Sequence, residues 1–254
     1  MSIPLRKVTR AVQKLLKSAG MEMVPYPPAD WVAGRNILRR VLSQLSIDCV
    51  LDVGANRGQY GSLLRDLGYR GQILSFEPVR ANFEALAACA AQRGPWKCFQ
   101  YALGAADGQA EINVTDEDVF SSFLKPREDS LERFPRNRVI RSETVQVRRL
   151  DAVLAESLAG VTEPRIYLKL DTQGFDLEVL AGAAGVLPGI LALQTEVSFR
   201  PVYHGMPGYE DSLRAFQACG FGVVDFMAVN RDSGGLCAIE MDCVMARTGL
   251  GKSK

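Results

Sequence analysis

The chain has 254 residues, of which 47% are hydrophobic and 23% charged, and its formal net charge at pH 7 is +1. These values are ordinary for one large soluble α/β domain with a full core. The small net charge argues against a nucleic-acid partner, because nucleic-acid-binding domains usually carry a strong basic excess. No uninterrupted apolar run approaches the roughly 20 residues of a membrane span. The N-terminus lacks a signal-peptide core, and we therefore expect a cytoplasmic protein.

Cysteine and histidine are too sparsely placed for a structural metal site. The 6 cysteines include no Cys-x-x-Cys pair, and His204 is the single histidine. We therefore expect neither a zinc site nor a disulfide framework, and most thiols should lie reduced within apolar elements.

Residues 1–20 combine a basic face with apolar residues at helical spacing. This pattern predicts a basic amphipathic helix, and residues 31–45 predict a second helix, so that residues 1–45 would form a helical cap. Two interpretations stay open for the first helix: it packs on the core with a solvated basic face, or it contacts an anionic membrane surface or a glycolipid. The basic residues are Arg6, Lys7, Arg10, Lys14 and Lys17.

The first strong motif is a short apolar run, Cys49 to Leu51, followed by Asp52 and a turn that contains Gly54 and Gly58. Apolar residues at helical spacing come next, so the stretch predicts the strand, tight turn and helix that open a βαβ unit. Glycine has no β-carbon, which permits positive φ and the close approach of a cofactor. The turn contains neither the Gly-x-Gly-x-x-Gly dinucleotide fingerprint nor a phosphate loop.

Acids follow the first two predicted strands. The second strand, residues 72–76, leads into Glu77 and Pro78. A carboxylate at the end of that strand can accept hydrogen bonds from both ribose hydroxyls of a nucleotide. Asp52 in the first strand is a poor neighbour for a pyrophosphate and a good one for a cation, which favours S-adenosylmethionine. The alternative is that both acids merely cap helices.

The next segment predicts a helix at residues 81–92 and a strand at 96–102, whose end at Tyr101 and Ala102 would face the adenine. Residues 109–114 and 144–147 alternate like half-buried strands and bound an insertion at about 109–148. Its polar loop contains Ser121 and Ser122. Loops of this length are commonly functional or mobile, so a substrate-facing lid and an ordinary insertion both stay open.

The second half alternates helices and strands. A helix is predicted at residues 150–158, a strand at 165–171 that ends in Asp171, a strand at 190–197 that contains Glu196, and a helix at 209–219. Two final strands follow at 223–229 and 236–245. This order predicts an α/β domain over residues 46–248, with a parallel sheet and a late antiparallel hairpin.

Seven motifs in this order resemble the FkbM family of S-adenosylmethionine-dependent methyltransferases, in its bacterial, saccharide-associated branch. The resemblance implies a class I methyltransferase, Rossmann-like fold, with a seven-stranded mostly parallel sheet and helices on both faces. It also implies methyl transfer to a hydroxyl of a saccharide, a glycolipid or a polyketide. The motifs are Asp52-Val-Gly-Ala-Asn-Arg-Gly-Gln-Tyr60, Ser75-Phe-Glu-Pro78, Ala102-Leu-Gly104, Ser121-Ser122, Lys169-Leu-Asp-Thr-Gln-Gly-Phe175, Val179-Leu-Ala-Gly-Ala183 and Gln194-Thr-Glu196.

The resemblance implies a role for each matching position. Glu77 would bind the ribose, and Tyr101 with Ala102 would flank the adenine. Asp171 and Glu196 would lie at the methyl-transfer end, with Asp171 also close to the cofactor. His204 stands where the family often has an acid, which puts a shared catalytic role for it in doubt. The methionine end would be held by Asp52, Gly54, Asn56, Gly58 and Tyr60, with Pro78, Ser121 and Ser122 near the cofactor or substrate.

Methyl transfer to oxygen requires that the acceptor hydroxyl lose its proton to a base. The candidates are Asp171, Glu196 and His204, of which histidine has the most suitable ordinary pKa, about 6.5. The two acids could also hold a divalent cation, but no third ligand is evident, so no metal site is predicted.

Rival functions are a dehydrogenase, a non-catalytic cofactor-binding domain and an RNA methyltransferase. The first would need the missing dinucleotide fingerprint, and the third is disfavoured by the net charge. A non-catalytic protein is disfavoured because the acids and glycines of the first turn are present. The acceptor, either a glycan or another small molecule, and the oligomeric state are left open by the sequence.

Overall fold

The computed structural model of the chain describes residues 29–158, 163–232 and 234–249. Contacts divide the chain between Leu38 and Arg39 into two units, and the account below concerns the unit that begins at Arg39. Helix α2 spans Ala29–Gln44. The basic helix predicted over residues 1–20 lies outside the described residues, and the cap over 1–45 stays a prediction. Within the described ranges, no helix is long and apolar enough to cross a membrane.

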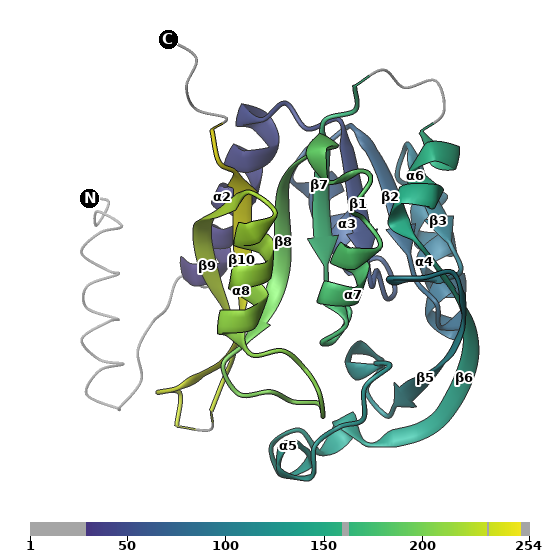
Figure 1. Cartoon of the computed structure of the whole chain (residues 1–254), viewed down its shortest axis with the longest axis vertical. Coiled ribbons are helices and arrows are strands. Elements are labelled where there is room, and N and C mark those ends of the chain that lie inside the picture. Colours follow the sequence, from purple (N-terminus) through teal and green to yellow (C-terminus); the bar gives the residue numbers. More distant parts are fainter. Residues whose placement is uncertain (1–28, 159–162, 233, 250–254) are drawn as a thin grey trace, which may run out of the picture. The chain divides into compact units, whose positions relative to one another are not determined.

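The second unit is built on a seven-stranded sheet of order β3-β2-β1-β7-β8-β10-β9 (Figure 1). Neighbouring strands pair in parallel from β3 to β8, and β10 is antiparallel to both β8 and β9. The predicted parallel sheet with a C-terminal antiparallel hairpin is therefore confirmed. The strands are β1 (Cys49–Val53), β2 (Gln72–Phe76), β3 (Trp96–Phe99), β7 (Ile166–Leu170), β8 (Ile190–Ser198), β9 (Phe221–Arg231) and β10 (Ala238–Arg247).

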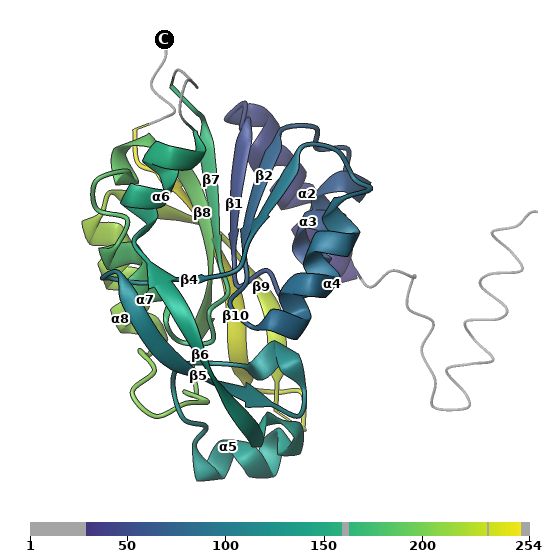
Figure 2. The ribbon, with the colours of Figure 1, turned by 90° about the vertical axis from the view of Figure 1, so that its right-hand side faces the viewer.

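Helices cover both faces of this sheet. Figure 2 shows α3 and α4 on one side of the strands and α6, α7 and α8 on the other. Every residue of β1 and β7 is buried, as expected for central parallel strands covered on both faces. The helices are α3 (Gln59–Asp66), α4 (Arg80–Ala90), α6 (Leu150–Ser157), α7 (Asp176–Ala181) and α8 (Tyr209–Ala218).

A second, three-stranded sheet carries the insertion. It contains β4 (Ala102–Leu103), β6 (Val139–Arg148) and β5 (Gly108–Thr115), in that order. The third strand of the main sheet was predicted over residues 96–102, but it ends at Phe99 because Ala102 and Leu103 pair with β6 instead. The β5–β6 connection, residues 116–138, contains three short helices, which are η1 (Asp118–Phe120), α5 (Glu128–Arg133) and η2 (Pro135–Asn137).

Helix α7 does not follow β7 directly. The strand ends at Leu170, and the helix starts only at Asp176. Gln173 and Gly174 have φ values of 54° and 93°, which lie outside the right-handed helical region. The chain therefore makes a left-handed turn at the end of β7, and this turn lies at the functional site.

Candidate active site

A cavity of about 430 Å³ lies where β1, β2 and β7 end. This is the edge at which open parallel sheets bind their ligands. The lining of this cavity is apolar on one side and polar on the other. Beside β2 and the second sheet it is apolar, with Phe76, Val79, Ala102, Leu103 and Ile112; beside β1, β7 and β10 it is polar, with Asn56, Gln59, Tyr60, Lys169, Asp171, Gln194 and Asp242.

Two glycines shape the turn after β1, and both use the positive φ that glycine permits: 74° at Gly54 and 89° at Gly58. A β-carbon on Gly54 would lie 1.9 Å from the backbone oxygen of Asp171. A β-carbon on Gly58 would lie 3.1 Å from Leu86 and 3.2 Å from Trp96. Glycine is therefore required at residue 54 because the turn after β1 meets the backbone at Asp171 there. Gly58 is enclosed by the side chains of Leu86 and Trp96.

Glu77 faces this cavity from the end of β2 and is 5% exposed. Its carboxylate accepts hydrogen bonds from the backbone N–H groups of Asn56 and Val79, each at 2.9 Å. Burial raises the pKa of Glu77 to about 7, although these two hydrogen bonds act in the opposite direction. Since a carboxylate can accept about four hydrogen bonds, Glu77 keeps acceptor capacity for a ligand.

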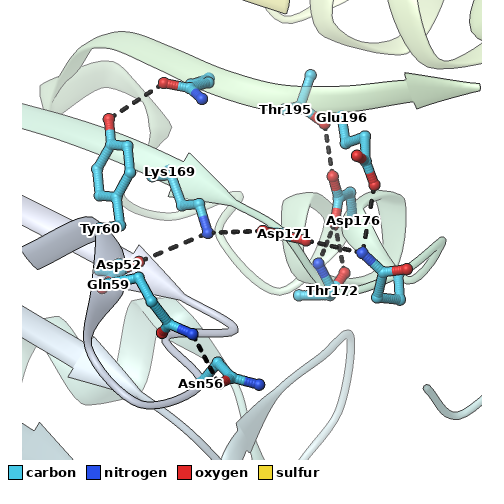
Figure 3. A network of polar contacts seen from close by, with 12 residues as sticks. Asp52, Asn56, Gln59, Tyr60, Lys169, Asp171, Thr172, Asp176, Thr195 and Glu196 are labelled. Carbon is cyan, nitrogen blue, oxygen red and sulfur yellow. Dashed lines mark hydrogen bonds and ion pairs between the residues drawn. The ribbon is translucent and has the colours of Figure 1, made fainter. Parts of the chain in front are cut away.

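Asp52 lies one layer behind the cavity wall. It is fully buried, accepts a hydrogen bond from the Ser75 hydroxyl at 3.1 Å, and lies 3.7 Å from the Lys169 ammonium. The ammonium is also 3.0 Å from Asp171, so Lys169 bridges the two carboxylates (Figure 3). Burial raises the pKa of Asp52, and Lys169 opposes that rise. Lys169, and not Asp52, therefore presents its charge to the cavity.

We expect the Lys169→Met variant to lose about 3–5 kcal/mol of unfolding free energy, because it leaves the buried Asp52 carboxylate without its cation. Adding Asp52→Asn should recover part of this loss, since the uncompensated charge is then removed. Urea denaturation of the single and double variants measures both effects. A loss below about 1 kcal/mol in the single variant, which is the range of a surface ion pair, would contradict the assignment.

A second cavity, of about 530 Å³, adjoins the first. Val119, Asp171 and Gln173 line both, so they form the boundary between the two spaces. The other residues that line the second cavity come from β8, β9, β10 and the β5–β6 connection. They are Glu117, Phe120, Arg133, Phe134, Pro135, Arg136, Glu196, Val229, Asn230 and Glu240.

Gln173 links the two carboxylates at this boundary. Its side-chain nitrogen donates to Asp171 at 2.9 Å and to Glu196 at 3.3 Å. Burial raises the pKa of Glu196 well above its ordinary value, and the nearby carboxylates of Glu240 and Asp171 raise it further. Glu240 is 2% exposed, and burial raises its pKa as well. The boundary therefore holds a carboxyl group whose proton affinity is well above that of an exposed glutamate.

Most of the residues predicted from sequence line one of these cavities. Those on the first cavity are Gly54, Asn56, Tyr60, Glu77, Pro78, Ala102, Ser121 and Asp171; Glu196 lines the second, as does Asp171. The structure places the others, Asp52, Gly58, Tyr101, Ser122 and His204, outside both linings.

The exceptions have other contacts. The Tyr101 ring packs on Phe76 and Phe99, at centroid distances of 5.8 and 5.7 Å. Ser122 donates to the backbone oxygen of Gln173 at 2.8 Å. The His204 side chain is 53% exposed and lies 3.1 Å from Glu128. The structure therefore gives no support to His204 as the base or to Tyr101 as an adenine contact.

Several lining residues were not identified from the sequence, namely Lys169, Gln173, Gln194, Glu240 and Asp242. One signal was available for the last two, since two acids interrupt an apolar strand in Ile239-Glu-Met-Asp-Cys-Val244. A charge in a buried strand needs a partner or a ligand. Gln173 and Lys169 lie inside a quoted motif, but only the fold shows which way they point.

No group of three or more histidine, cysteine, aspartate or glutamate side chains suited to a metal ion occurs among the residues that the structure describes. The two acids considered for a divalent cation, Asp171 and Glu196, instead share a hydrogen-bond donor.

Comparisons with known proteins agree with this geometry. The family described as Methyltransferase FkbM domain matches residues 52–223. A curated relative, the 2-O-methyltransferase NoeI of Sinorhizobium fredii (strain NBRC 101917 / NGR234), is 26% identical over 165 residues, which cover 61% of this chain and 65% of the relative. The chain therefore spans less than two thirds of that relative's length.

Solved structures give only distant likenesses. A fibrillarin of Aeropyrum pernix, in complex with natively bound S-adenosyl-L-methionine, is 12% identical, with 84% of this chain and 74% of that chain covered and a TM-score of 0.44. The methyltransferase domain of bacterial CtHen1 is 10% identical, with 84% and 96% covered and a TM-score of 0.43.

Proposed function

The chain belongs to the FkbM methyltransferase domain family, and from this premise we propose that it transfers a methyl group from S-adenosylmethionine to a hydroxyl of a saccharide or glycolipid. The observation that carries the proposal is the shared boundary of the two cavities at Val119, Asp171 and Gln173. One cavity suits the methyl donor and the other the acceptor, and a methyl group need only cross the boundary.

The first cavity fits the donor from end to end. Its apolar side beside β2 suits an adenine, and Glu77 suits the two ribose hydroxyls. Its polar side offers Lys169 to the carboxylate of the methionine end and Asp242 to the amino group. The buried hydroxyl of Ser121, which lines this cavity, has no hydrogen-bond partner within the described chain. A buried polar atom of this kind calls for a ligand or a water.

The second cavity favours an acceptor rich in hydrogen-bond donors. Its wall presents the carboxylates of Glu196 and Glu240, and the amides that could have donated are already engaged: Gln173 donates to Glu196, and Asn230 donates to Glu240 at 2.9 Å. Adjacent sugar hydroxyls can donate to these carboxylates and accept from Arg133 and Arg136 in the same wall, whereas an acceptor with one isolated hydroxyl leaves some of these groups unmatched. Phe120 and Phe134 supply apolar surface in the same wall.

The chain's own groups orient the acceptor and take its proton. S-adenosylmethionine would supply a methyl group on a positively charged sulfonium, and cleavage of that carbon–sulfur bond would leave neutral S-adenosylhomocysteine. Asp171 lines both cavities and orients the acceptor hydroxyl at the boundary. Glu196, in its ionised form, receives the hydroxyl proton as the new oxygen–carbon bond forms, because its raised pKa makes that ionised form a stronger base than an ordinary glutamate. Alignment of the two substrates supplies the rest of the rate enhancement.

Calorimetric titration of the full chain with S-adenosylmethionine and with S-adenosylhomocysteine tests the donor site, and magnesium is added or left out in parallel. Saturable binding of both, independent of magnesium, is the expected result. Transfer of a labelled methyl group to a panel of neutral mono- and oligosaccharides then tests the acceptor class, with polyketide alcohols as the comparison. Absence of donor binding would reject the proposal outright.

Donor affinity should fall as the pH is lowered below about 7. Glu77 accepts ribose hydrogen bonds best when ionised, and its pKa without ligand is about 7. The pKa of Glu77 is higher in the folded protein than in the unfolded chain. The ionisation of Glu77 therefore destabilises the fold as pH rises from the unfolded to the folded pKa, and bound donor offsets this loss. We expect a loss of at most about tenfold in affinity per pH unit.

The Glu77→Gln variant should bind the donor more weakly and lack this part of the pH dependence. The variant is needed because Asp242, whose pKa burial raises to about 6, also lines the cavity and titrates nearby. A pH profile unchanged by Glu77→Gln would assign the titration to Asp242 and would contradict the ribose contact.

A further inference from the structure

Gln173 occupies a backbone conformation that disfavours its own side chain. Its φ is 54°, and Gly174 follows with a φ of 93°. Positive φ is uncommon outside glycine, and asparagine and aspartate adopt it more readily than glutamine. A glycine would fit the same turn without that penalty. A residue held in such a conformation points to a role for its side chain.

Both polar atoms of the Gln173 side chain are engaged. The two N–H groups of its amide go to two carboxylates, to Asp171 at 2.9 Å and to Glu196 at 3.3 Å. The amide oxygen accepts a hydrogen bond from the Tyr203 hydroxyl at 2.9 Å. The two carboxylates set the orientation of the amide, because the reverse orientation would point its oxygen at both of them.

Gln173 is also tied to the β5–β6 connection. The Ser122 hydroxyl donates to the backbone oxygen of Gln173 at 2.8 Å. The Tyr203 hydroxyl, which holds the amide, also lies 2.8 Å from the backbone oxygen of Phe120. Gln173 lines both cavities. The carboxylates at the boundary, the wall of the acceptor cavity and the turn after β7 are thus joined through one side chain.

We propose that Gln173 is a positioning residue for methyl transfer, whose amide holds the carboxylates of Asp171 and Glu196 at a fixed separation and keeps Glu196 ready to accept a proton. The inference rests on the proposed function and deepens it. A hydrogen bond donated to a carboxylate favours its ionised form. Without the amide, Glu196 would stay protonated to a higher pH.

The surroundings of Glu196 make this contact consequential. Carboxylates face Glu196 from β10, from the turn after β7 and from α7, and each of them favours the protonated form of Glu196. The cations in the wall of the second cavity come from the β5–β6 connection. These groups are Glu240, Asp242, Asp171 and Asp176 on the acidic side, and Arg133 and Arg136, with Glu117 beside them, in the wall. The Gln173 amide is a neutral donor that acts against this acidic field.

Two substitutions test the proposal, Gln173→Gly and Gln173→Asn. Glycine relieves the backbone, and asparagine also tolerates positive φ but is one methylene shorter, so it cannot span both carboxylates. Both variants should unfold at the same or a higher urea concentration than the wild type. Both should lose at least about tenfold in kcat on the best acceptor of the saccharide panel. The dissociation constant for S-adenosylmethionine should change by less than about threefold.

The control is Ser46→Gly. Ser46 has a φ of 47° and lies exposed in the loop before β1, away from both cavities. Relief of the backbone there should stabilise the protein and leave kcat unchanged. A gain in stability alone therefore cannot account for a loss of turnover in the Gln173 variants.

Two further measurements separate positioning from a structural role. Carbon-13 labelling of glutamate carboxyls reports the titration of Glu196 without any acceptor, and its midpoint should move to higher pH in Gln173→Gly. Adding Gln173→Gly to Glu196→Gln should lower kcat no further, because the two residues act through one group.

Three results would overturn the proposal: kcat retained in Gln173→Gly, an unmoved Glu196 titration, or loss of stability in step with activity. A wild-type protein that binds no S-adenosylmethionine would instead reject the proposed function, and the carboxyl titration would still report whether Gln173 controls Glu196.

Discussion

Replacement of Glu196 by glutamine is expected to lower kcat by about 10²–10⁴-fold, the usual contribution of a positioned base. The amide has the shape of the carboxyl group but cannot take the proton of the acceptor hydroxyl. Donor affinity should stay close to that of the wild type, because Glu196 lines the second cavity and not the first. Calorimetry with S-adenosylmethionine and initial-rate measurements on the best saccharide acceptor test the two halves of this expectation.

The pH profile and the stability of the same variant sharpen the test. A base works in its ionised form, so wild-type kcat should fall as pH falls through the raised pKa of Glu196, and Glu196→Gln should lack that limb. The carboxyl destabilises the fold as pH rises above its unfolded pKa, since its folded pKa is the higher of the two. The variant should therefore be at least as stable as the wild type near neutral pH.

A matched control comes from α7. Glu178 is exposed on that helix and lines neither cavity, so Glu178→Gln makes the same chemical change and should leave kcat unchanged. If Glu196→Gln keeps its turnover while Asp171→Asn loses it, the base is Asp171. If Glu196→Gln unfolds, its assignment as the base fails.

The Gly54→Ala variant should lose more than about 4 kcal/mol of unfolding free energy, which places it among the most damaging single substitutions. A β-carbon at residue 54 would lie 1.9 Å from the backbone oxygen of Asp171, and the φ there is 74°. Backbone cannot move aside as a flexible side chain can, so either the turn after β1 or the end of β7 must shift. Since Asp171 lies at the boundary of the cavities, any folded fraction should also lose turnover.

Gly68→Ala separates the steric effect from the backbone penalty. Gly68 has a φ of 90°, but a β-carbon there would meet no atom within 4 Å. Gly68→Ala should therefore lower the unfolding free energy only by the roughly 1–2 kcal/mol that a left-handed backbone conformation costs a non-glycine residue. Urea denaturation of both variants measures the difference, and equal losses would show that the approach of the two backbones does not constrain the fold.

Some features of the site follow from local sequence signals, and others depend on residues that are distant in the sequence. The turn after β1 was predictable because its signals are local: a buried strand, two glycines and a helix pattern lie within one short stretch, and both glycines use the positive φ that glycine permits. Glu77 was predictable for a related reason, since it directly follows an apolar strand and strand ends collect at one edge of a parallel sheet.

Other expectations failed because partners distant in sequence decide them. The strand predicted to reach residue 102 ends at Phe99, since Ala102 and Leu103 pair with β6. Asp52 was expected to hold the methionine end of the cofactor, but it is fully buried beside the Lys169 ammonium and lines neither cavity. The strand end at Tyr101 and Ala102 was expected to face the adenine; Ala102 lines the first cavity, and the Tyr101 ring packs on Phe76 and Phe99.

The sequence by itself determined the fold class, the family and the turn after β1, because strand, turn and helix signals act over a few neighbouring residues. Only the tertiary structure decided which side chains gather around the boundary of the two cavities. Antiparallel pairing of β10 with β8 sets Asp242 opposite Glu196 and Glu240 opposite Ser198, and the left-handed turn at Gln173 directs its amide at two carboxylates. Register between distant strands and the direction of a side chain depend on packing of the whole domain, which no short stretch of sequence encodes.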